Sequence, residues 1–392
     1  MRVASIDILR ALTMVFMIWV NDFFTLIDVP KWLEHANGIE DYLGFSDIIF
    51  PLFLFIVGLS IPYAIEYRFQ QKESKVQISK HIVVRTLSLL LIGVFMVNYE
   101  TAHHESISIG KEYWELLMTL AVFLIWMQWK KSPVPKKWYR ILQVFGFCIF
   151  IFLAIIYKGG ENGEKWMTTQ WWGILGLIGW AYVINALVYL FCNYAYRLHI
   201  MIILWLVFNL LTVLVHTDNL DINNKTIQIF SVLYSGTIPA FTTAGVVATL
   251  LFKKLNESNL KLFYGILIVL GILNIVFALI TRSIWGISKI QGTPSWVAIC
   301  TGIGFILFVV LHYISDVRKK VNWAKLISPA GTATLTCYMI PYFIYPLRNI
   351  TGIRLPDFLN SSIIGLIVSF TIALAVVIYT GWLEKNRFKL KL

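Results

Sequence analysis

The residues best suited to chemistry lie close together in the first part of the chain. His35 stands in a polar loop, DVPKWLEHANGIEDYLG, which separates two apolar segments. Asn21 and Asp22 end the first segment, and Asp47 opens the second. Near neutral pH an imidazole can accept and return a proton, so this group predicts a proton-transfer site if the protein is an enzyme. Simpler interpretations stay open: Asn21 and Asp22 as a polar helix end, and Asp47 as a carboxylate favoured by the dipole of its helical turn.

A second set of charged residues lies in the first and third apolar segments. Asp7 and Arg10 are three residues apart, which places them on one face of a helix, where they can form an ion pair. That pair either makes entry of the helix into the membrane tolerable or belongs to an anion pocket, because a guanidinium suits phosphate groups. Arg85 either extends its charge to the membrane surface or joins the same pocket.

Arg10 and Asn21 together predict a polar stripe along one helix. About three helical turns separate them, so they fall on nearly the same face, about 16 Å apart. Ionisable groups in a membrane segment are costly and usually face a protein interior or a wet cavity. The stripe is what a cavity running along this helix would need.

The elements that must position these residues are two membrane helices. The apolar segments 6–26 and 45–67 are each long enough to cross a hydrocarbon core of about 30 Å at about 1.5 Å per residue. We therefore interpret residues 1–67 as a helical hairpin that carries the candidate site in its connecting loop.

The rest of the chain repeats the apolar pattern. Hydrophobic residues make up 58% of the sequence and charged residues 14%, and no polar stretch is long enough to fold as a soluble domain. We predict an all-α, polytopic membrane helix bundle that forms a single domain over residues 1–392, with about twelve transmembrane helices. The expected spans are 6–26, 45–67, 82–97, 113–129, 141–157, 171–191, 200–215, 232–252, 262–281, 295–314, 332–346 and 361–382.

The distribution of positive charge predicts the orientation. Twelve spans place both termini on one side of the membrane. Of the 33 Lys and Arg residues, nine fall on the opposite side: Lys31, Lys111, Lys158, Lys165, Lys225, Arg282, Lys289, Arg348 and Arg354. Because positive residues collect on the cytoplasmic face, both termini are predicted to be cytoplasmic and His35 to lie on the outer face. The net charge of +12 then reflects topology, not binding of nucleic acid.

Other site types find little support in the sequence. The four cysteines, Cys148, Cys192, Cys300 and Cys337, stand in apolar segments without a CxxC spacing, which is typical of buried small side chains. The histidines form no HExxH motif or Cys/His cluster, so no metal site is predicted. Basic runs such as Lys130–Lys131 with Lys136–Lys137 are interpreted mainly as topology signals, and one of them could meet nucleotide phosphates.

The opening stretch resembles a known family. The segments SIDILRALTMVFMIWVND, EHANG and FSDIIFPLFLFIVGLSI resemble the transmembrane acyltransferases of the heparan-alpha-glucosaminide N-acetyltransferase family, as a divergent bacterial branch. VVRTLSLLLIGVF, with Arg85, is similar to the family's third segment. AGTATLTCYMIPYF resembles a late segment but has Ala333 where the family has Asn and Pro341 where it has His.

The resemblance implies an acyl transfer across the membrane. Acetyl-CoA would be the donor on the cytoplasmic side, near Asp7, Arg10 and Arg85, and an amino sugar or glycan on the outer, periplasmic face would be the acceptor. His35 would carry the acetyl group covalently or act as a general base, with Asp47 beside it, and Asn21 would donate a hydrogen bond to the developing oxyanion. The protein would then be a multi-pass protein of the cell inner membrane.

Two other functions stay open at this point. A twelve-helix transporter or flippase for a sugar or glycolipid could use the same polar stripe as a permeation path, and a structural membrane protein could use it for packing. The sequence leaves open the identity of the acceptor, the oligomeric state, including a homo-oligomer, and the effect of Ala333 and Pro341 on activity.

Overall fold

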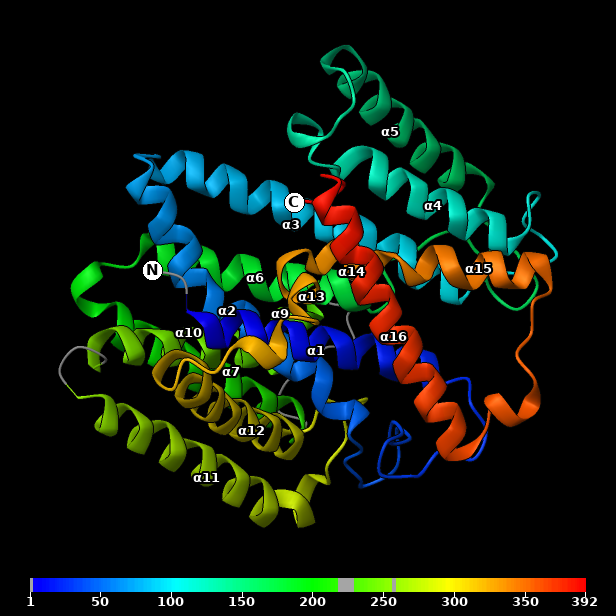
Figure 1. Cartoon of the computed structure of the whole chain (residues 1–392). Coiled ribbons are helices and arrows are strands. Elements are labelled where there is room, and N and C mark those ends of the chain that lie inside the picture. Colours follow the sequence, from blue (N-terminus) through cyan, green and yellow to red (C-terminus); the bar gives the residue numbers. More distant parts are fainter. Residues whose placement is uncertain (1–2, 218–228, 256–258) are drawn as a thin grey trace. The chain divides into compact units, whose positions relative to one another are not determined.

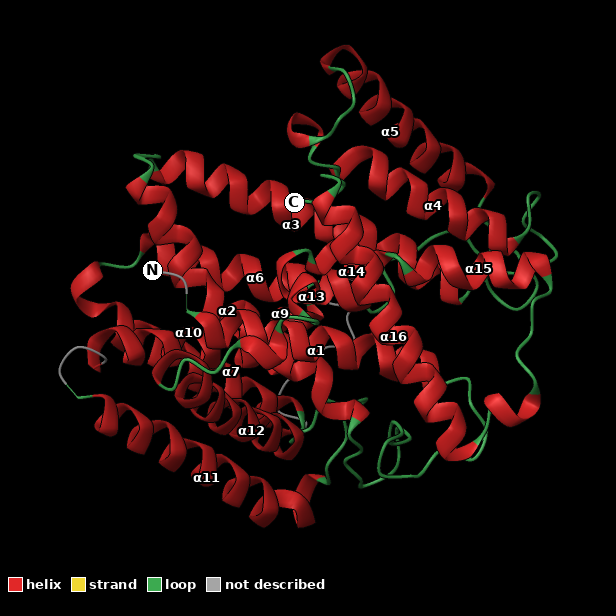
Figure 2. Cartoon of the chain, viewed as in Figure 1, coloured by secondary structure: helices red, strands yellow, loops and turns green. Residues whose placement is uncertain are grey.

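The computed structural model describes residues 3–217, 229–255 and 259–392. In this part of the chain all regular elements are helices, and β-pairing is limited to isolated bridges (Figure 2). The predicted all-α fold is therefore confirmed. The main helices are α1 (Ala4–Phe23), α2 (Ser46–Gln70), α3 (Lys75–Glu100), α4 (Lys111–Trp126), α5 (Tyr139–Ile156), α6 (Gly173–Phe191), α7 (Arg197–Val215), α9 (Ser231–Tyr234), α10 (Thr237–Leu255), α11 (Leu260–Trp285), α12 (Pro294–His312), α13 (Ser328–Thr332), α14 (Thr334–Met339), α15 (Pro341–Thr351) and α16 (Ser362–Lys385).

Ten helical segments in the described ranges are long and apolar enough to cross a membrane. They account for ten of the twelve expected spans. The expected span 113–129 corresponds to α4, which has 16 residues. The expected span 332–346 corresponds to parts of α13, α14 and α15, because the backbone leaves the helical conformation at Ala333 and a new helix begins at Pro341.

The chain divides into two compact units. The first unit comprises residues 1–13, 30–87 and 177–323, and the second comprises residues 14–29, 88–176 and 324–392. The His35 loop from Pro30 onward and the start of α2 belong to the first unit, whereas Asp28 and Val29, at the beginning of the loop, belong to the second unit.

In the first unit, α10 is the central helix and packs against α2, α7, α11 and α12. Its buried face is built from small residues, and the backbones of α2 and α10 come very close at Gly58 and Gly245. Thr242 and Thr249 of α10 donate hydrogen bonds to the carbonyls of Leu54 and Leu59, at 3.1 and 2.9 Å. Small residues and interhelical hydrogen bonds are the usual means of packing helices in lipid. On another side of this unit, α11 runs beside α12 (Figure 1).

In the second unit, α4 packs against α5 and α15, and α16 packs against α13 and α14. Trp114 of α4 is completely buried, and its indole donates a hydrogen bond to the carbonyl of Leu153 at 3.1 Å. Trp19, on the part of α1 that belongs to this unit, donates in the same way to Leu366 of α16 at 3.1 Å. The indole N–H groups of these two tryptophans are thus satisfied at helix contacts.

Candidate active site

The loop that carries His35 is folded back onto the start of α2. The amides of Phe45 and Ser46 donate to the carbonyls of Trp32 and Leu33, at 2.7 and 3.2 Å, and the Ser46 hydroxyl also donates to Leu33. Gly44 permits this return, because a Cβ atom at that position would lie 1.8 Å from the Glu34 carbonyl oxygen. The loop is therefore held in one conformation next to the first turn of α2.

The fold brings His35 and Asp47 together. Nδ1 of His35 lies 2.7 Å from Oδ1 of Asp47, whose side chain is 1% exposed, while that of His35 is 29% exposed. The other carboxylate oxygen accepts hydrogen bonds from the amides of Ala36 and Gly44, at 3.0 and 3.2 Å. When the Asp47 carboxylate accepts from Nδ1–H of His35, the lone pair of the ring is on Nε2. A histidine oriented in this way is suited to act as a base or nucleophile.

Lys289 completes this group, and sequence reasoning did not select it. Its Nζ lies 3.2 Å from Nδ1 of His35 and 3.9 Å from Oδ1 of Asp47. Burial lowers the pKa of Lys289 below that of an ordinary lysine, while the carboxylate of Asp47 acts in the opposite direction. The charge count placed Lys289 on the same membrane face as His35, but nothing in the sequence distinguished it from the other basic residues there.

The loop that carries Lys289 is tied to the His35 loop at several points. Asp41 accepts hydrogen bonds from the amide of Ile287 and from Nε of Arg282, at 2.7 and 2.8 Å, and the amide of Tyr42 donates to the Ile287 carbonyl at 3.1 Å. At the back of the site, the indole of Trp296 donates to the backbone carbonyl of Asp47 at 3.2 Å. These bonds fix the ammonium and the imidazole relative to each other.

Asn21 and Asp22 belong to the second unit. The side chain of Asn21 is exposed, whereas Asp22 is buried, with 7% exposure, and accepts a hydrogen bond from the Tyr345 hydroxyl at 2.9 Å. Asp22 thus ties α1 to α15 within this unit. The role of Asn21 in binding an oxyanion stays a prediction.

The predicted ion pair of the first helix forms. Nη1 of Arg10 lies 3.0 Å from Asp7, and Nη2 of Arg10 donates to the Ser60 hydroxyl at 2.7 Å. The guanidinium of Arg85 lies over the ring of Tyr182, 4.8 Å from its centre. All five residues belong to the first unit, and an anion pocket around the two arginines stays a prediction.

The described residues show no three His, Cys, Asp or Glu side chains placed to hold a metal ion together. The four cysteines are free thiols, and Cys148 is exposed on α5 while Cys300 and Cys337 are buried.

Comparison with known proteins points to one family. Residues 2–158, less than half of the chain, match the family described as heparan-alpha-glucosaminide N-acetyltransferase, catalytic. The mouse (Mus musculus) heparan-alpha-glucosaminide N-acetyltransferase is 32% identical over 97 residues, and the human (Homo sapiens) protein is 29% identical over 97 residues. Each alignment covers 25% of this chain and 14% of the relative, so the chain spans only a small part of the length of these proteins. The resemblance drawn from the opening hairpin is confirmed, and it extends through α3, α4 and α5: residues 2–158 are similar to the catalytic region of heparan-alpha-glucosaminide N-acetyltransferases.

Proposed function

We propose that this protein is a membrane acetyltransferase that moves an acetyl group from cytoplasmic acetyl-CoA to an amino sugar or glycan on the outer face of the inner membrane. The observation that carries the proposal is the 2.7 Å contact between His35 and the buried carboxylate of Asp47, located inside the region that matches the family. A loop histidine that contacts a buried carboxylate is a suitable candidate for a catalytic group, and this supports the proposal.

The chemistry can follow two balanced routes. In direct transfer, Nε2 of His35 takes a proton from the acceptor amine while the nitrogen of the amine attacks the thioester carbonyl. The C–S bond then breaks, and the CoA thiolate leaves and is protonated. In the covalent route, Nε2 attacks the thioester carbonyl, the C–S bond breaks and the CoA thiolate leaves. The acceptor amine then attacks the acetyl carbonyl, the bond to Nε2 breaks, and the proton that the amine loses passes through Nε2 to the thiolate. In both routes Asp47 orients the ring and stabilises its positive charge.

Roles for the other predicted residues follow from this proposal. Asn21 would donate a hydrogen bond to the oxyanion, and Arg10 and Arg85 would meet the phosphates of acetyl-CoA on the cytoplasmic side. Because Arg10 already contacts Asp7 and Ser60, binding of a phosphate there would exchange one charge-assisted contact for another. Asp7 would then hold the guanidinium in place in the absence of donor.

The test is acetyl transfer from labelled acetyl-CoA to a panel of amino sugars and glycans by the purified full-length protein. His35→Ala should lower the rate by about 10²–10⁴-fold, the usual contribution of acid–base catalysis. His104→Ala is the matched control, because His104 is 68% exposed and contacts only Glu112 among the ion pairs of the described residues. Wild-type transfer by His35→Ala, or sugar uptake by proteoliposomes that needs no acetyl-CoA, would contradict the proposal, and the second result would favour a transporter.

A further inference from the structure

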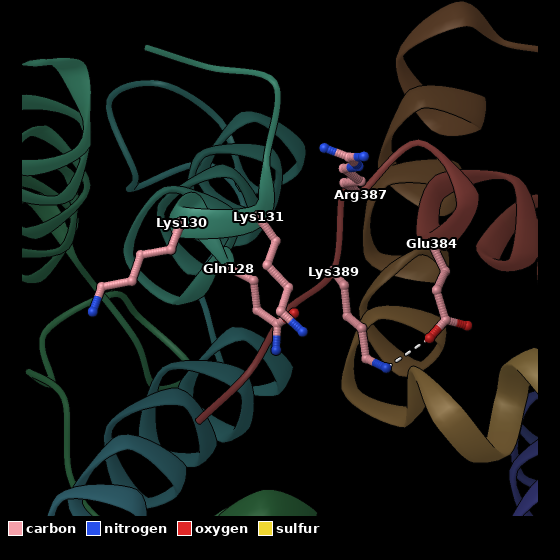
Figure 3. Close-up of a pocket in the computed structure, with 6 residues that line it drawn as sticks. All are labelled: Gln128, Lys130, Lys131, Glu384, Arg387 and Lys389. Atoms are coloured by element: carbon pink, nitrogen blue, oxygen red, sulfur yellow. Dashed lines mark hydrogen bonds and ion pairs between the residues drawn. The ribbon is translucent and has the colours of Figure 1, made fainter. Parts of the chain in front are cut away.

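The second unit contains a basic pocket that the proposed acetyl transfer does not use. It is a cavity of about 450 Å³ lined by Gln128, Lys130, Lys131, Glu384, Arg387 and Lys389 (Figure 3). Its walls come from the turn after α4, from the last turn of α16 and from the chain that follows α16. Two segments far apart in the sequence therefore build one site.

The end of the chain is fixed in this pocket by its backbone. The amide of Gln128 donates to the Lys389 carbonyl at 2.9 Å, and the amide of Lys391 donates to the Trp126 carbonyl at 2.8 Å. Between them Leu390 is buried, and its amide donates to the Thr336 hydroxyl at 2.9 Å. The cations of this segment are thus held at the pocket by an ordered backbone.

Positive charge exceeds negative charge in the pocket. Its single carboxylate, Glu384, accepts from Lys389 at 2.6 Å and from the Thr332 hydroxyl at 2.7 Å, so it is already satisfied. Within the described part of the chain, Lys130, Lys131 and Arg387 have no ion-pair partner. Figure 3 shows the side chains of Lys130 and Arg387 extending away from the other labelled residues, on two sides of the pocket, while the ammonium of Lys131 lies beside Gln128. Such a surplus attracts an anion, and a guanidinium with an ammonium suits phosphate.

The position of the pocket along the helices indicates where the anion comes from. α16, which ends at Lys385, and the segment Lys136–Ile156 are both candidate membrane spans, and the pocket residues lie within a few positions of their ends. Trp129 and Trp138 flank the basic turn, and tryptophans are enriched where a helix leaves the lipid. Clusters of Lys and Arg at this level meet anionic headgroups.

We propose that this pocket binds the phosphate of an anionic phospholipid headgroup in the leaflet next to the C-terminal end of α16. The volume of about 450 Å³ admits a headgroup phosphate with its glycerol. A water-soluble phosphate has the same chemistry, so the experiment has to separate the two sources.

The experiment measures lipid retention by the full-length protein with native mass spectrometry, in phosphatidylcholine nanodiscs that contain phosphatidylglycerol. The double variant Lys131→Gln/Arg387→Gln should bind phosphatidylglycerol about tenfold more weakly, as expected when two charge-assisted contacts are lost. Lys136→Gln/Lys137→Gln is the matched control, because it removes the same charge from exposed positions in the same loop that do not line the pocket. The charge-conserving variant Lys131→Arg/Arg387→Lys should keep most of the binding.

Three results would overturn the proposal. The first is equal retention of phosphatidylglycerol by wild type and Lys131→Gln/Arg387→Gln. The second is equal weakening by the control pair, which would indicate general surface attraction. The third is displacement of the lipid by millimolar glycerol 3-phosphate or inorganic phosphate, which would assign the pocket to a soluble ligand. The assay does not depend on acetyl transfer, so its outcome is independent of the proposed function.

Discussion

At the scale of single residues, Asp47→Asn tests whether the negative charge of Asp47 matters in addition to the hydrogen bonds that its carboxylate accepts. The carboxylate accepts from the His35 ring and from the amides of Ala36 and Gly44. Asp47→Asn keeps the shape and one accepting oxygen but loses the negative charge that stabilises a protonated imidazole. We expect kcat for acetyl transfer to fall by about 10²–10⁴-fold, the range of acid–base catalysis.

The control for Asp47→Asn is Glu40→Gln. Glu40 lies in the same loop, but its carboxylate forms an exposed pair with Lys31, away from the histidine. Removing that charge should leave kcat unchanged. Wild-type kcat in Asp47→Asn, or equal losses in both variants, would show that the buried carboxylate has no special function in the reaction.

Lys289 provides a pH dependence with a defined sign. Burial lowers its pKa below the ordinary value of 10.5, although Asp47 opposes this. The unfolded chain then binds this proton more tightly than the folded protein, so stability rises with pH from the folded pKa up to about 10.5. Lys289→Met removes this contribution.

The unfolding temperature of wild type relative to that of Lys289→Met should therefore increase as the pH is raised towards 10.5. Thermal unfolding in detergent at several alkaline pH values measures it, and Lys158→Met, at an exposed position in another loop, is the control. Parallel pH curves for wild type and Lys289→Met would contradict the predicted shift.

The candidate site was partly predictable from the sequence for a physical reason. His35 and Asp47 are twelve residues apart and joined by a short loop, so local chain geometry alone keeps them close. Lys289 follows His35 by 254 residues, and its approach depends on how α12 packs against α2 and α11 packs against α12. Spacing along the chain carries no information about such a contact, whereas the count of charges per membrane face did place the two residues on one side.

At the scale of helices, the contact of α2 with α10 makes a strong prediction. A Cβ atom at Gly245 would lie 2.0 Å from the Phe55 carbonyl oxygen, and backbone cannot move away as a flexible side chain can. Gly245→Ala should therefore destabilise the protein by about 1–3 kcal/mol, the usual cost of overpacking, or more if the helices separate. The thermal unfolding midpoint of the purified protein measures the effect.

Gly265→Ala is the matched control, because no atom lies within 4 Å of a Cβ atom at that position of α11. Alanine is a better helix former than glycine by about 0.8–1.0 kcal/mol, so this variant should be as stable as wild type or more stable. If both alanine variants unfolded at the wild-type temperature, the close approach of α2 and α10 would be wrong.

The length of the hydrophobic segments predicted the positions of the helices well, but it did not predict where a helix is interrupted. α2 begins within one residue of the predicted start. At Phe45 and Ser46 the sequence changes from polar to apolar, and the His35 loop folds back onto the helix at the same place. The segment 332–346 reads as one apolar run, but Pro341 lacks an amide hydrogen and Ala333 adopts a non-helical backbone, so three short helices form. Apolar composition indicates burial in lipid or protein without specifying an unbroken helix.

At the scale of the whole molecule, membrane orientation depends on the number of crossings. α4 has 16 residues, about 24 Å of helix, which is shorter than a hydrocarbon core of about 30 Å. If α4 crosses, the His35 loop and the basic loop around Lys137 lie on opposite faces, as the charge distribution predicts. If α4 does not cross, the two crossings by α2 and α3 leave the basic loop on the same face as the His35 loop.

Single cysteines at Ile39 and Lys137, in a variant without the four native cysteines, decide between these arrangements. Ile39 is 97% exposed in the His35 loop, and Lys137 is exposed in the basic loop. We expect a membrane-impermeant maleimide to label Ile39→Cys in intact cells and Lys137→Cys only after permeabilisation. Labelling of both in intact cells would mean that α4 does not cross, and labelling of Lys137→Cys alone would reverse the orientation. Since acetyl-CoA is supplied from the cytoplasm, the reversed orientation would place His35 on the donor side and remove the outer-face acceptor from the proposed reaction.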